Sequence, residues 1–148
     1  MNPLPALVDK FKGYQNRYGR FIELFTAFKK CLGKEIARVE LKHFEIEQPN
    51  LLEPHAPLAI NAYGRQYQVA MAMRVTAGSC KGVLIFSRVI NDKAIEVETV
   101  TFNGQGVLDV KLNVENSAND DELEIENWHH ALALVLWLID KELNSTQA

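Results

Sequence analysis

The side chains best spaced for metal or acid–base chemistry lie near the C-terminus of the sequence. Glu126 and His129 form a Glu-x-x-His pair, with His130 beside it. Residues three apart share one face of a helix, and carboxylate-bridged di-iron bundles use this spacing. Such a centre needs a second Glu-x-x-His pair, whereas the other two histidines, His43 and His55, fall outside the predicted helices. We therefore predict no bound metal and no other cofactor.

A second candidate for chemistry is the segment 78–82, which reads Gly-Ser-Cys-Lys-Gly. It could form a small anion-binding nest, or Lys81 could lower the pKa of the Cys80 thiol. The segment lacks the spacing of a phosphate-binding loop and joins two predicted strands, so an ordinary β-turn explains it better. No Ser/His/Asp triad can be identified without geometry. We therefore predict that the protein is not an enzyme.

Length and composition describe an ordinary globular domain. The chain has 148 residues, of which 47% are hydrophobic and 24% charged, so we expect one domain over 1–148. The N-terminus lacks a secretion signal, and Cys31 and Cys80 have no C-x-x-C spacing, which predicts reduced thiols and a cytoplasmic location. The longest apolar run, 131–139, is too short for a bilayer, which requires about 20 residues. We expect no membrane partner.

Charge is distributed unevenly along the chain. The formal net charge is -3, yet the stretch from Lys10 to Lys34 contains seven basic residues and one acid. The stretch from Glu115 to Glu142 contains eight acids and one base. The two ends are therefore electrostatically complementary, and the overall acidity makes nucleic-acid binding unlikely.

The clearest periodicity belongs to the N-terminal segment. Its apolar residues alternate in steps of four and three, which only a helix places on one face. We predict a helix over about 4–32, ended by a left-handed cap at Gly33 and open to a break near Gly13 or Gly19. Aromatic residues on such a stripe usually belong to the core, so the basic residues between them need not bind nucleic acid. The stripe consists of Leu7, Phe11, Tyr14, Tyr18, Phe21, Phe25, Phe28 and Leu32.

Alternating patterns between 36 and 114 predict about five to six strands, and a helix follows over about 120–143. Short turns, including Gly64-Arg65 and Asn91-Asp92, favour a meander. The predicted class is α+β: a meandering antiparallel sheet flanked by a long N-terminal helix and an apolar C-terminal helix. The predicted strands are 36–46, 58–63, 66–75, 82–90, 94–102 and 107–114.

The C-terminal helix is apolar on two sides, with Leu134, Trp137 and Leu138 forming its second apolar surface. The strand 82–90 is likewise apolar on both faces. A second copy of the chain would bury this surplus most simply, so the sequence suggests a homodimer with these three side chains at the interface.

By elimination, the sequence favours a non-catalytic protein-interaction module, such as an adaptor, an inhibitor or a chaperone-like protein, that binds itself and an unidentified protein partner. The proline-rich connection 48–57 is a candidate partner-binding segment, with Leu51, Leu52 and His55 as contacts. The alternative is a domain that binds a small apolar ligand between the sheet and the C-terminal helix. Its pocket would be lined by Met71, Met73 and Trp128.

Overall fold

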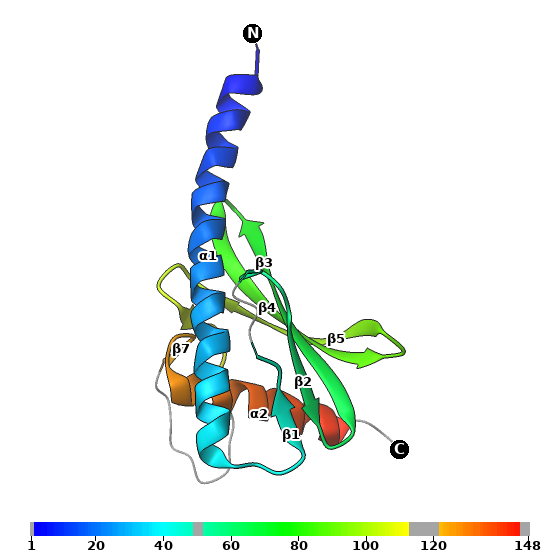
Figure 1. Cartoon of the computed structure of the whole chain (residues 1–148). Helices are drawn as coiled ribbons and strands as arrows, with labels where there is room; N and C mark the ends of the chain where they lie inside the picture. The colour runs from blue at the N-terminus through cyan, green and yellow to red at the C-terminus, as the bar shows by residue number, and fades with distance from the viewer. Residues whose placement is uncertain (1, 49–51, 113–121, 146–148) are drawn as a thin grey trace.

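The computed structural model describes residues 2–48, 52–112 and 122–145. Within these residues, two helices accompany seven strands that form one curled antiparallel sheet, a half-barrel (Figure 1). The predicted α+β class, with a helix at each end of an antiparallel meander, is confirmed. The elements are α1 (Leu4–Val39), β1 (Phe44–Ile46), β2 (Leu58–Ala62), β3 (Arg65–Thr76), β4 (Ser79–Ile90), β5 (Lys93–Phe102), β6 (Val107–Leu108), β7 (Leu123–Glu124) and α2 (Trp128–Ser145).

Helix α1 is one continuous helix, and it is longer than the sequence predicted. Gly33 lies inside it, and the helix ends at Val39, where Glu40 adopts the left-handed conformation with φ of 52°. The predicted strand over 36–46 is therefore wrong for its first part, because Ile36 and Val39 continue the helical spacing of four and three beyond Leu32. Only Phe44–Ile46 of that stretch forms a strand.

The strands follow one another across the sheet in sequence order, from β1 to β7. Three two-residue turns join the long strands, each with positive φ at both central residues, as in type I′ hairpins: Tyr63-Gly64, Ala77-Gly78 and Asn91-Asp92. The Asn91-Asp92 turn is confirmed. The turn placed at Gly64-Arg65 begins one residue earlier, because Arg65 already pairs with Ala62 as part of β3.

The C-terminal end of the sheet differs from the prediction. Strand β6 stops at Leu108, whereas the prediction extended it to 114, a stretch whose last two residues lie outside the described ones. The segment expected to begin a helix near 120 contains β7, since the buried Leu123 pairs with Leu108. Helix α2 begins only at Trp128. The side-chain oxygen of Asn127 caps it by accepting hydrogen bonds from the backbone N–H groups of His129 and His130, at 3.0 and 3.2 Å.

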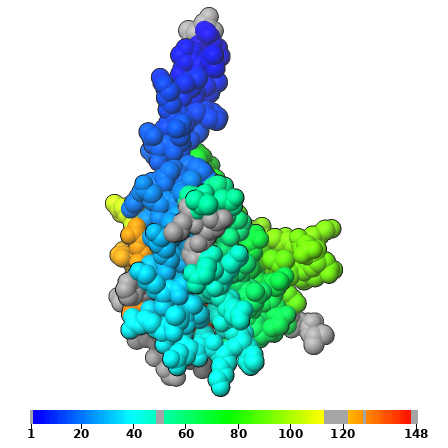
Figure 2. All heavy atoms as spheres, viewed as in Figure 1, coloured from blue at the N-terminus to red at the C-terminus, as the bar shows by residue number. Residues whose placement is uncertain are grey.

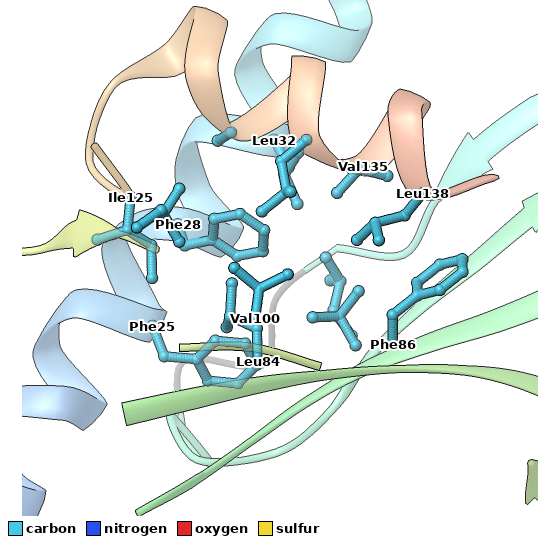
Figure 3. Close-up of a cluster of buried hydrophobic side chains, with 14 of the residues drawn as sticks. Phe25, Phe28, Leu32, Leu84, Phe86, Val100, Ile125, Val135 and Leu138 are labelled. Carbon is cyan, nitrogen blue, oxygen red and sulfur yellow. The ribbon is translucent and has the colours of Figure 1, made fainter. Parts of the chain in front are cut away.

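Helix α2 packs against α1 on one side and against the sheet on another, which explains why its sequence is apolar on two sides. It contacts α1 along one side, and its other side faces strands β3 and β4 (Figure 3). Neither described helix is apolar over a length that could cross a membrane. Side chains from both helices and the sheet meet in the core, including Phe28, Leu32, Leu84, Phe86, Val135 and Leu138.

The close approach of Gly82 to the core generates a stability prediction. A Cβ at Gly82 would overlap the ring of Phe102, which is buried and packs edge-on against Phe21 at 5.5 Å. We expect Gly82→Ala to lower the free energy of unfolding by about 1–3 kcal/mol, because the ring has no space to move into. Gly33→Ala is the control: a Cβ there meets nothing within 4 Å, so it should raise stability by up to about 1 kcal/mol. Denaturant unfolding measures both, and a stabilising Gly82→Ala would contradict this packing.

Candidate functional site

Arg20 marks the point at which α1 leaves the body of the protein. Its Nε donates to the backbone oxygen of Gly104 at 3.1 Å, in the β5–β6 turn, and its guanidinium lies 3.7 Å from the Glu126 carboxylate. A third contact, at 3.3 Å, joins it to Glu23 on the same helix. Nearly all side chains before Arg20 are exposed, whereas apolar side chains from Phe21 onward enter the core. We call residues 4–19 the arm, and Figure 2 shows this end of α1 projecting beyond the rest of the molecule.

The arm carries the same apolar stripe as the rest of α1, but there it is largely uncovered. Phe11 is 65% exposed and packs edge-to-face with Tyr14, with ring centroids 5.5 Å apart. The stripe forms one wall of a groove of about 810 Å³, and Met73, near the end of the β3–β4 hairpin, lies on the other side. The groove is lined by Leu4, Leu7, Val8, Phe11, Lys12, Tyr14, Gln15, Tyr18 and Met73.

Basic residues border this stripe on both sides. At 100° per residue, Lys10 and Arg17 fall along one flank and Lys12 along the other, while Asp9 and Asn16 lie on the back of the helix. Among the described residues, none of these three cations forms an ion pair that holds it to the body. The complementarity predicted between the two ends of the chain is thus realised at Arg20–Glu126, and the arm keeps its positive charge.

A buried carboxylate fixes α2 to the sheet. Glu142, whose side chain is only 4% exposed, accepts hydrogen bonds from Arg65 at 3.0 Å, from Arg88 at 3.2 Å and from the Tyr67 hydroxyl at 2.6 Å. Burial, together with the bond to Glu142, raises the pKa of Tyr67 to about 12. Two cations and one hydroxyl therefore surround one anion, an arrangement that holds the anion in place and joins three elements.

The connection predicted to bind a partner is attached to α1 by a second buried charge. Lys29 donates at 2.9 Å to the backbone oxygens of both Pro54 and Ala56, and desolvation lowers its pKa. Leu52 is 92% exposed and His55 is also exposed. Leu51 lies outside the described residues. Exposure of Leu52 fits a binding role, which stays a prediction.

The side chains of the predicted Glu-x-x-His motif and of the neighbouring His130 each contact a different residue. Glu126 faces Arg20, the Nδ1 of His129 lies 3.4 Å from the buried Glu35, and the Nδ1 of His130 accepts a hydrogen bond from the Glu124 backbone. Across residues 2–48, 52–112 and 122–145, no three His, Cys, Asp or Glu side chains gather closely enough to hold a metal ion.

The side chains proposed for a dimer interface mostly belong to the core of their own chain. Leu134 and Leu138 are buried, and Trp137 is half-buried with the Lys141 ammonium 5.1 Å from its ring centre. The two-sided apolar pattern of α2 therefore needs no second copy to explain it.

The residues proposed to line a ligand pocket lie in different parts of the structure. Met71 is buried in the core, whereas Met73 lines the groove beside the arm. Trp128 begins α2, and its side chain lies outside the described part. Both candidate thiols are buried and free of disulfides, and desolvation raises the pKa of Cys31.

A second hollow, of about 620 Å³, lies at the β2–β3 turn and is more polar. Its lining includes Asn61, Tyr63 and Gln66, together with both arginines that bind Glu142. Because Glu142 offsets part of their charge, this hollow is a weaker candidate for a binding site than the groove beside the arm.

Sequence reasoning identified the helix and its stripe correctly but assigned the whole stripe to the core. The signal that could have separated the two halves is length. Leu4 continues the same spacing before Leu7. With Leu4 included, the stripe extends to Leu32, about 42 Å of helix at 1.5 Å per residue, which is longer than one small sheet can cover.

Comparisons of this chain with protein-family models, with curated proteins and with solved structures gave no match.

The environment of Glu142 generates the second prediction. Glu142→Gln removes the buried negative charge that pairs with both Arg65 and Arg88. We therefore expect the free energy of unfolding to fall by about 3 kcal/mol. Glu98→Gln is the matched control, because it breaks an exposed ion pair with Lys141 on the same helix and should cost less than about 1 kcal/mol. Denaturant unfolding compares them. Equal losses would show that burial of Glu142 contributes nothing.

Proposed function

We propose that this protein is a non-catalytic protein-interaction module that captures a partner on the apolar stripe of the arm. The observation that supports the proposal is the exposure of a regular row of large apolar side chains, led by Phe11, on an arm that the described body covers only in part. Contiguous exposed apolar surface of this kind commonly marks an interaction site, since leaving it in water costs free energy.

The arm is suited to binding because it is already a helix. An isolated helix of this length is only marginally stable, but the arm continues a helix whose later turns are packed in the core. Nucleation is thus supplied by the body, and the side chains are presented in order before a partner arrives. Binding then loses little conformational entropy, which favours affinity.

The rest of the fold holds the base of the arm. Arg20 joins α1 to the β5–β6 turn and to the residues just before α2, while Lys29 joins it to the connection before β2. The buried Glu142 then fixes α2 to β3 and β4. The interaction surface therefore belongs to a helix that is attached to the body at several points along its length.

Site-specific cross-linking tests this proposal. A photoreactive amino acid at position 11 should form cross-links to a defined protein in the native host, because Phe11 lies at the middle of the stripe. The same group at position 16, on the opposite face of the same helix, is the control and should form few. Mass spectrometry identifies the products. Equal, unselective labelling from both positions would contradict the proposal.

A further inference from the structure

The groove beside the arm also indicates the chemistry of its occupant, and this step rests on the proposed function. We infer that the groove receives an amphipathic helix of another protein whose apolar face is flanked by acidic side chains. Three features of the described residues lead to this assignment: the period of the stripe, the apolar lining of the groove and the charge along its borders.

The period of the stripe fits a helix. Leu4, Leu7, Phe11, Tyr14 and Tyr18 follow one another at steps of three and four, a seven-residue repeat. This repeat places apolar side chains along a seam into which the side chains of a second helix interlock. The arm is about 24 Å long, enough for four turns of a partner helix.

The lining of the groove comes almost entirely from the arm itself. Among the described residues, Met73 on the β3–β4 hairpin is the one lining side chain from the sheet. A helix laid along the stripe would also contact this side chain, as amphipathic helices contact the hydrophobic grooves that bind them.

The charges along the groove select an acidic partner. Lys10 and Arg17 border one side of the stripe and Lys12 borders the other, and none of them is in an ion pair within the described part of the chain. Carboxylates on the flanks of a bound helix would face these cations, as charged flanking residues do in paired helices.

The same charges disfavour a second copy of this chain. In an antiparallel pair of arms, Lys10 would lie next to Arg17 of the other copy at both ends of the contact, bringing like charges together. In a parallel pair, the α1 helix of the other copy would continue toward the β3–β4 hairpin, which stands on the same face of α1 as the stripe. Neither arrangement fits as well as an acidic partner.

Binding of two synthetic peptides tests the inference. Both contain three heptads with Leu at the seam positions, but one carries Glu on both flanks and the other carries Lys. We expect the Glu peptide to bind the intact protein at least about tenfold more tightly than the Lys peptide, with the difference shrinking in high salt. Fluorescence anisotropy of labelled peptides measures both affinities.

Variants of the arm identify the surface that binds. Phe11→Asp should abolish binding of the Glu peptide without changing the melting temperature, because Phe11 lies outside the core. The double variant Lys10→Glu with Arg17→Glu should bind the Lys peptide in preference. Asn16→Glu, which changes the charge of the back of the arm but not its flanks, is the control and should alter the affinity for the Glu peptide by less than about twofold.

Four results would overturn the inference. These are equal affinities for the two peptides, no saturable binding of either, a dimer in sedimentation that Phe11→Asp disperses, and tighter binding to phosphatidylserine vesicles that Phe11→Asp removes. The first two would leave the proposed function standing if position 11 still cross-links to a defined protein, so the chemistry of the partner and the function of the arm are tested separately.

Discussion

A mismatch between the length of α1 and the size of the body beneath it governs this molecule. The helix has 36 residues, about 54 Å at 1.5 Å per residue, and the core buries its apolar stripe only from Phe21 onward, with Tyr14 partly buried against it. The stripe itself does not change at that point, because the same spacing of large apolar residues continues to Leu4. One half of a uniform pattern therefore builds the fold, and the other half remains in water.

Charged side chains attach both helices to the body. Arg20 contacts the body where α1 leaves it, and Lys29 attaches the helix again nine residues further along. Glu142 attaches α2 to the sheet. Lys29 and Glu142 are buried, and a buried charge is costly when a partner is lost, so their contacts favour one arrangement of the elements over nearby alternatives. Arg20 is half-exposed and contributes less.

Most of the fold could be predicted from the sequence, because its signals are local. The spacing of apolar residues predicted both helices, strand-like runs bounded by turn residues predicted β2 to β5, and Asn91-Asp92 marked a turn. The errors arose where tertiary contacts decide: Gly33 was assigned to a cap although the stripe continues beyond it, and 122–126 were assigned to a helix although Leu123 is drawn into the sheet by pairing with Leu108.

The candidate site was harder to predict, because periodicity shows which side chains share a face but not what covers that face. Phe11 and Phe25 look equivalent in the sequence, yet one is 65% exposed and the other is buried. The partners of Glu142 were equally hidden, since Arg65, Arg88 and Glu142 come together only through the packing of α2 on the sheet.

If the arm binds a helix, its stripe is exposed in the isolated chain and is covered when the helix is bound. Thiol alkylation distinguishes these two states, because the native Cys31 and Cys80 are buried and give a slow background. We expect Phe11→Cys to be labelled as fast as Asn16→Cys in the protein alone. The Glu peptide should then protect position 11 and leave position 16 reactive. Slow labelling of position 11 in the isolated protein would show that the stripe is already covered and does not bind a partner there.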